Sequence, residues 1–117
     1  MAHPVSGDVA GYLARAGRWY RWLSKLLPDD TVIAPWILYV ELVGNDADPE
    51  ERAKGIAGDL MQVGRCDGVV LVGGRVSEGM VLELEAAKEY FDLTFLGSEP
   101  PRDRDAEHVG RLLRGQL

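Results

Sequence analysis

The chain has 117 residues, enough for one domain with a single modest core, which we place at residues 1–117. Its apolar content of 46% and charged content of 27% exclude disordered and fibrous classes. A net charge of −6 without a basic cluster argues against nucleic-acid polymers and anionic membranes as partners. Small molecules stay open as partners.

Cysteine and histidine are scarce in this sequence. Cys66 is the single cysteine, so no internal disulfide can form and a reducing compartment is expected. The two histidines, His3 and His108, leave too few soft ligands for a structural zinc site. No apolar run approaches the roughly 18 residues that span a bilayer, and the first residues lack the layout of a signal peptide. We therefore expect a cytoplasmic protein without a membrane segment or a metal.

The first third of the chain has apolar residues at helical spacing. They predict a helix that is capped by Ser6 or Asp8, ends near Leu26, and has this core-facing stripe: Tyr12, Ala16, Trp19, Leu23 and Leu26. After a break at a proline, residues 31–34 read as a buried strand.

The remaining elements alternate between helices and short strands. Asp48 suits the N-cap, and Pro49 the first position, of a helix that runs to about Gly64. The later elements are predicted at residues 68–72 (strand), 77–90 (helix), 93–96 (strand) and 106–113 (helix).

Helices of this length between strands imply crossover connections. Crossovers make a parallel sheet with helices on both of its faces. We therefore expect an α/β chain that forms a small Rossmann-like (flavodoxin-like) three-layer domain. Such a fold normally begins with a strand, yet only two residues precede His3, so the first strand is either short or missing.

Two acidic residues stand out by their place on their helices. The strand at residues 68–72 leads into a glycine-rich turn and a helix, where open α/β sheets usually bind ligands. On this helix Glu83 lies about 60° from the centre of the apolar stripe, whereas three other glutamates lie far round on the opposite side. Asp59 has the same offset on the preceding helix. Half-buried carboxyl groups of this kind suit acid–base or nucleophilic chemistry, although they also occur on ordinary amphipathic helices.

A set of short motifs surrounds these two residues. In chain order they are Asp59-Leu60, Cys66-Asp67 before an apolar strand, and Ser77-x-Gly79-x-x-x-Glu83 followed by Ala86 and Ala87. This order resembles the nucleoside 2-deoxyribosyltransferase-like family, whose specific part is matched over about residues 59–87. The family contains transferases that move 2-deoxyribose between bases, and hydrolases that cut the N-glycosidic bond of nucleosides or nucleoside monophosphates.

The resemblance implies roles for the acidic pair and for the start of the helix. Glu83 would be the nucleophile that forms a covalent glycosyl-enzyme, and Asp59 would protonate the departing base or orient the sugar. Ser77 and Gly79 would bind the 5′ end of the sugar, while Ser77 is equally suited to capping the helix. Glu78 would repel a phosphate unless it points away, so nucleosides and monophosphates both stay open as substrates. No metal or organic cofactor is implied.

The other candidate substrate-binding residues lie near the ends of the first two strands. His3, Ser6 and Gly7 resemble the family's substrate-binding turn, and Trp36 and Tyr39 are placed to stack on a base or to pack in the core edge. Because relatives often complete their pockets at subunit contacts, we expect a homodimer or a higher homo-oligomer. The alternatives to an enzyme are a non-catalytic nucleotide-binding or sensing module with the same fold and, with no specific residue in its favour, a flavodoxin-like electron carrier.

Overall fold

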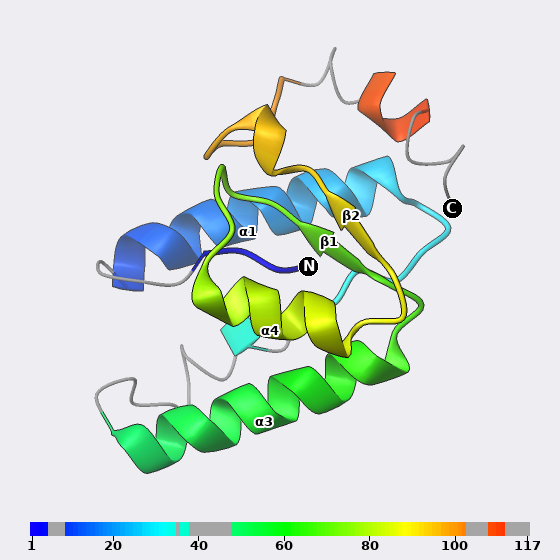
Figure 1. Ribbon diagram of the computed structural model, residues 1–117. Coiled ribbons are helices and arrows are strands. Elements are labelled where there is room, and N and C mark those ends of the chain that lie inside the picture. Colours follow the sequence, from blue (N-terminus) through cyan, green and yellow to red (C-terminus); the bar gives the residue numbers. More distant parts are fainter. Residues whose placement is uncertain (5–8, 35, 38–47, 103–107, 112–117) are drawn as a thin grey trace.

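The fold is known from a computed structural model that describes residues 1–4, 9–34, 36–37, 48–102 and 108–111. Its elements are α1 (Val9–Leu26), α3 (Pro49–Arg65), β1 (Val69–Leu71), α4 (Glu78–Ala86), β2 (Tyr90–Asp92) and the 3-10 helix η1 (Thr94–Leu96) (Figure 1). The two strands pair in parallel, and α4 makes the crossover between them. The chain is therefore a mixed α/β protein with a small parallel sheet.

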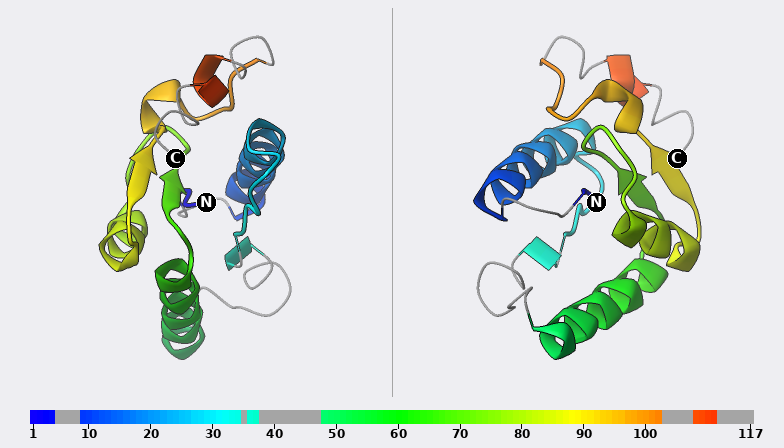
Figure 2. Two further views of the ribbon diagram at one scale, coloured as in Figure 1. Left: turned by 90° about the vertical axis from the view of Figure 1, so that its right-hand side faces the viewer. Right: turned by 60° about the vertical axis from the view of Figure 1, so that its left-hand side comes forward.

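Helix α1 covers one side of the two strands (Figure 2). The stripe predicted from its spacing is buried throughout: Tyr12, Ala16, Trp19, Leu23 and Leu26. The rings of Trp19 and Trp22 meet edge to face, with their centroids 5.5 Å apart. A core cluster joins Trp19, Trp22, Leu23 and Leu26 to Val72, directly after β1, and to Leu93, directly after β2.

Helices α3 and α4 lie on the other side of the strands (Figure 2). Val69 and Leu71 of β1 pack there against Val63 of α3 and Met80 of α4. Val70, between them in the strand, packs against the α1 cluster instead. This alternation is the period of two that a β-strand imposes on its side chains. Burying each large apolar side chain contributes about 1.5–3 kcal/mol.

The starts of α3 and α4 are fixed by side-chain caps, as predicted. The Asp48 carboxylate accepts a hydrogen bond from the main-chain N–H of Glu50 at 2.9 Å, and Pro49 follows at the first helical position. The Ser77 hydroxyl accepts from the main-chain N–H of Met80 at 3.3 Å.

The last strand begins earlier than predicted. Helix α4 ends at Ala86 rather than near residue 90, because Ala87 already has extended backbone angles of φ −78° and ψ 149°. The strand then covers Tyr90–Asp92, and the predicted strand at residues 93–96 is wrong. Those residues include the 3-10 turn η1, in which Phe95 is 75% exposed.

Main-chain hydrogen bonds to β1 explain this earlier register. The N–H of Val69 donates to the carbonyl of Glu89 at 3.0 Å, and the N–H of Leu93 donates to the carbonyl of Leu71 at 2.8 Å. The ladder therefore runs from residue 89 to residue 93. Beyond it the chain turns, because the Asp92 carboxylate accepts from the N–H of Thr94.

The first residues of the chain contribute a very short piece of parallel pairing. Ala2 forms a bridge with Leu71 on one side. On the other side the main-chain nitrogen of Met1 donates to the carbonyl of Ile33 at 2.8 Å. The strand predicted at residues 31–34 does not form a regular strand, because that single hydrogen bond does not make a ladder.

The turn after β1 requires glycine at two positions. Gly73 and Gly74 have φ angles of 103° and 86°, a region that other residues rarely adopt. A Cβ atom on Gly73 would lie 2.5 Å from Cδ of Pro4, and one on Gly74 would lie 2.9 Å from the nitrogen of Ser98. The turn is therefore packed between the start of the chain and the loop after η1.

The predicted terminal helix is seen in part. Residues 108–111 are helical and His108 is exposed, while the rest of that prediction lies outside the described residues. Within the described part of the chain, none of the helices combines the length and apolar character that crossing a bilayer requires.

Candidate functional site: a hydrogen-bonded carboxyl pair

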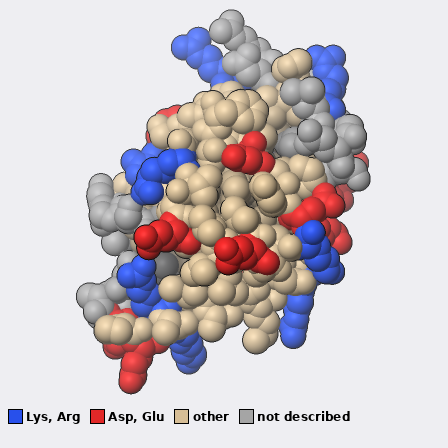
Figure 3. Space-filling model, viewed as in Figure 1, with Lys and Arg blue, Asp and Glu red and all other residues tan. Residues whose placement is uncertain are grey.

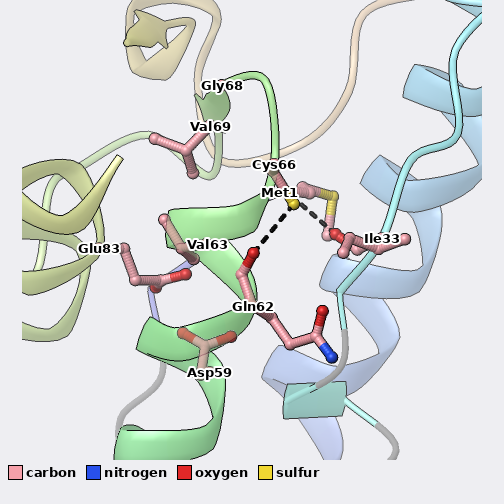
Figure 4. Close-up of a pocket in the computed structure, with 9 residues that line it drawn as sticks. All are labelled: Met1, Ile33, Asp59, Gln62, Val63, Cys66, Gly68, Val69 and Glu83. Carbon is pink, nitrogen blue, oxygen red and sulfur yellow. Dashed lines mark hydrogen bonds between the residues drawn. The ribbon is translucent and has the colours of Figure 1, made fainter. Parts of the chain in front are cut away.

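Asp59 of α3 and Glu83 of α4 face each other between the two helices (Figure 4). Their carboxyl groups form a side-chain hydrogen bond. Both residues lie on the same side of the sheet, since α3 and α4 share that side. The sequence predicts that each carboxyl group lies at the edge of the apolar stripe of its own helix. In the structure these two edges face each other.

The pair is more buried than ordinary helix carboxylates. Glu83 is only 8% exposed, deeper than the boundary position predicted for it. Asp59 is half-buried, as its angular position predicts. The other three glutamates near α4, Glu78, Glu85 and Glu89, are exposed, again as predicted.

Burial and mutual contact shift the pKa of both carboxyl groups upward. Desolvation, followed by the charge of Asp59 and the hydrogen bond to it, raises the pKa of Glu83 to about 9. Desolvation also raises the pKa of Asp59, while its hydrogen bond with Glu83 acts in the opposite direction. With the pKa of Glu83 raised to about 9, the pair holds a proton at neutral pH.

The pair borders a small pocket between α3, α4 and the first residues of the chain (Figure 4). The described residues that line it are Met1, Ile33, Asp59, Gln62, Val63, Cys66, Gly68, Val69 and Glu83. Its volume of about 20 Å³ is room for a water molecule. A molecule as large as a nucleoside can therefore enter only if the lining moves apart.

Two further polar groups of α3 and its C-cap line this pocket. Gln62 follows Asp59 by three residues, and Cys66 follows it by seven, so all three lie on one helix face. Gln62 is not among the residues predicted from the sequence, and Cys66 enters the prediction only as the single cysteine and as part of the Cys66-Asp67 motif. Their helical spacing from Asp59 is the signal that could have found them. No such signal links Ile33 to this pocket, because that residue reaches it only through the tertiary fold.

The residues predicted to bind the sugar's 5′ end lie at the start of α4 and are not among the described lining of the pocket. Ser77 is the N-cap, so its structural role is confirmed. Gly79 lies in the first turn, where a Cβ atom would meet nothing closer than the Ser77 hydroxyl at 4.0 Å. Ser77 and Gly79 therefore lie together at the start of α4, and neither is among the described residues that line the pocket.

The rings of His3 and Trp36 lie beside each other. Their ring planes differ by 22° and their centroids are 6.4 Å apart. Nδ1 of His3 donates to the carbonyl of Pro4 at 2.8 Å, which leaves Nε2 as an acceptor, and burial lowers the pKa of this histidine. The indole N–H of Trp36 donates to the carbonyl of Met1 at 3.3 Å.

Three predicted site residues, Ser6, Gly7 and Tyr39, lie outside the described residues. For metal binding, the described ranges contain no group of three or more His, Cys, Asp and Glu side chains that could hold an ion.

A family described as "Domain of unknown function (DUF7768)" matches residues 1–91. The chain belongs to the DUF7768 family. The matched range contains Asp59, Glu83 and every described residue of their pocket, so the whole candidate site lies in the DUF7768 part of the chain. The comparison with curated proteins found no match, and neither did the comparison with solved structures.

Proposed function

We propose that this protein cleaves the N-glycosidic bond of a nucleoside or nucleoside monophosphate and passes the sugar to water or to another base. The observation that carries the proposal is the buried Asp59–Glu83 pair, which holds one proton beside a pocket. Cleavage of a glycosidic bond needs one carboxyl group as a nucleophile and another as an acid. The motif around Glu83, which resembles the nucleoside 2-deoxyribosyltransferase-like family, supports the same assignment.

The contact between the two carboxyl groups favours a covalent mechanism. Inverting glycosidases separate their carboxyl groups by about 6.5–9.5 Å to leave room for water between them. Asp59 and Glu83 interact directly, which fits the shorter separation of about 5–5.5 Å that retaining enzymes use. A double displacement through a glycosyl-Glu83 intermediate is therefore the chemistry that suits this pair.

In this mechanism the proton first moves from Glu83 to Asp59 along their hydrogen bond. The Glu83 carboxylate then attacks the anomeric carbon as the carbon–nitrogen bond breaks. The electrons of that bond go to the base, which takes the proton from Asp59. Water that gives a proton to Asp59, or an acceptor base, then displaces Glu83 from the sugar. Positive charge developing on the sugar favours the ionised form of Glu83, which offsets its high pKa.

We also propose that the sheet is the core of a Rossmann-like, flavodoxin-like three-layer domain. Hydrogen bonds join Ile33 to Met1 and Ala2 to the β1 ladder, and β1 pairs with β2. Numbered along the chain, the four segments are the one at Ala2, the one at Ile33, β1 and β2. Side by side they lie in the order second, first, third, fourth, which is the strand order of flavodoxin-like sheets. The position of α1 on one side and of α3 and α4 on the other supports this arrangement (Figure 2).

The substrate can be a nucleoside or a monophosphate in this proposal. Glu78, which would repel a phosphate at the start of α4, is exposed. Acidic side chains are spread over the face of the protein that Figure 3 shows. Trp36 is half-buried beside His3 and is available to stack on a base.

The experiment that tests the proposal is incubation with a panel of nucleosides and 5′-monophosphates, with and without an acceptor base. Chromatography would detect free base or an exchanged nucleoside. We expect the wild type to cleave at least one member and Glu83→Gln to lose at least about 10³-fold in rate. Glu85→Gln, an exposed glutamate of the same helix, is the matched control and should keep wild-type activity.

Two outcomes of this experiment would count against the proposal. Equal rates of cleavage by wild type and Glu83→Gln would show that Glu83 is not the nucleophile. Tight nucleotide binding without cleavage of any member would support the sensing module instead. The homo-oligomer and the cytoplasmic location stay predictions, and light scattering of the purified protein would measure the first.

A further inference from the structure

We propose that Gln62 selects the leaving base by hydrogen-bonding to its edge. This inference rests on the proposed function, because it assigns a substrate contact within the same pocket. Gln62 lies on α3 one turn beyond Asp59 and lines the pocket of the carboxyl pair. Its side chain extends from α3 toward the side of the pocket formed by Ile33 (Figure 4).

The carboxamide of Gln62 has no structural task in the described part of the chain. The side chain is exposed, and its amide group makes no hydrogen bond to the described residues. The hydrogen bond that this residue does make uses its main-chain carbonyl, which accepts from the thiol of Cys66 at 3.2 Å. To a ligand, this carboxamide would offer one acceptor oxygen and two N–H donors.

The position of Gln62 matches where a departing base would lie. Residues three apart on a helix have Cβ atoms about 5–6 Å from each other, so Gln62 and Asp59 are neighbours on the surface of α3. Asp59 is the group that would protonate the leaving base, which places the base next to Asp59 during cleavage. The edge of the base then falls within reach of Gln62, while the apolar side chains of Ile33 and Val63 border the same space.

The chemistry of a carboxamide fits the edge of a nucleobase. Purines and pyrimidines carry a hydrogen-bond donor next to an acceptor, and a glutamine can bond to both at once. Asp59 and Glu83 both take part in the proposed reaction, as acid and nucleophile, so neither serves to recognise the base. Among the described lining, Gln62 is thus the side chain that offers both a donor and an acceptor to the base. A matched pair of bonds of this kind contributes about 1–3 kcal/mol of discrimination.

The test compares Gln62→Met with wild type on adenosine and on purine riboside, which lacks the amino group. Methionine keeps the length and helix propensity of glutamine but removes the donor and acceptor. We expect wild type to favour one nucleoside by about tenfold or more in kcat/KM, and Gln62→Met to abolish that preference through KM with kcat little changed. Met61→Leu, an exposed neighbour that does not line the pocket, should behave as wild type.

Two results would overturn the role of Gln62 without touching the proposed function. One is an unchanged preference between the two nucleosides in Gln62→Met. The other is a fall in kcat at constant KM, which would place Gln62 in the chemical step instead of in base selection. If wild type cleaves nothing, the proposed function fails by itself. Calorimetric binding of the same two nucleosides to wild type and Gln62→Met would then still decide whether Gln62 distinguishes them.

Discussion

The carboxyl group of Glu83 on α4 hydrogen-bonds the carboxyl group of Asp59 on α3. Each group raises or lowers the proton affinity of the other, so the two titrate as a pair. Glu83 is buried, and its partner Asp59 lies on a different helix. The protonation state of the two carboxyl groups therefore depends on how α3 packs against α4.

The protonation of Glu83 makes the stability of the fold depend on pH. Its pKa is about 9 in the folded protein against an ordinary value of 4.5. The folded state therefore holds an extra proton between these values, and the stability due to that proton is complete below about pH 4.5 and lost as pH rises to about 9. The free energy of unfolding should fall by up to about 1.4 kcal/mol per pH unit. Urea unfolding across this range would measure the slope.

Glu83→Gln is the control for this pH dependence. An amide does not titrate, and it can still donate a hydrogen bond to the Asp59 carboxylate. We expect the variant to show a flatter profile and to exceed wild type in stability near pH 8. Parallel profiles for the two proteins would contradict a buried, protonated Glu83.

Replacing Asp59 should shift the proton affinity of its partner downward. The charge of Asp59 and its hydrogen bond both raise the pKa of Glu83, so Asp59→Asn removes the charge and should lower that pKa. Carbon-13 NMR of the Glu83 carboxyl would follow the change. Under the proposed function, the cleavage rate should also fall by about 10²–10⁴-fold, because the base loses its acid.

Asp67→Asn serves as the matched control for that experiment. Asp67 is exposed and does not line the pocket. The control should leave both the Glu83 titration and the cleavage rate as in wild type. A Glu83 pKa that is the same in Asp59→Asn and Asp67→Asn would show that the two carboxyl groups do not interact.

Two glycine substitutions should have opposite effects on stability. Gly73→Ala forces a side chain onto a φ of 103° and against Cδ of Pro4 at 2.5 Å, and should destabilise the fold by about 2–4 kcal/mol. Gly58→Ala, in α3 with nothing within 4 Å of the added Cβ, should stabilise it by about 0.5–1 kcal/mol through helix propensity. Thermal unfolding would measure both changes. A Gly73→Ala protein as stable as wild type would mean that this turn is not packed as described.

The packing of α4 against β1 should depend on Met80. This side chain is fully buried with Val69 and Leu71, so Met80→Ala should cost about 2–5 kcal/mol in free energy of unfolding. Val81→Ala changes the neighbouring residue, which is 40% exposed, and should cost less than about 1 kcal/mol. Chemical denaturation would measure the free energy of unfolding of both variants. Similar losses in the two variants would contradict the packing of the Met80 face of α4 against β1.

Local signals were enough to predict the apolar stripe of α1 and the starts of α3 and α4, while the cap predicted for α1 at Ser6 or Asp8 lies outside the described residues. The α1 stripe, the Asp48 cap and the Ser77 cap depend on residues within one or two turns of each other, and all three are found in the structure. The end of α4 was misplaced because it depends on the ladder between β1 and residues 89–93, which joins distant parts of the chain. The strand expected at residues 31–34 was wrong because its pairing partner is so short.

The sequence by itself determined that Asp59 and Glu83 each lie at the edge of an apolar helix face, since helical angle depends only on spacing along the chain. Only the tertiary structure decided that those edges meet, that Glu83 is buried, and that Gln62 and Cys66 line the same pocket. The physical reason is desolvation. The pKa of a carboxyl group is set by what surrounds it, and at this site the surroundings come from α3, α4 and the first residues of the chain together.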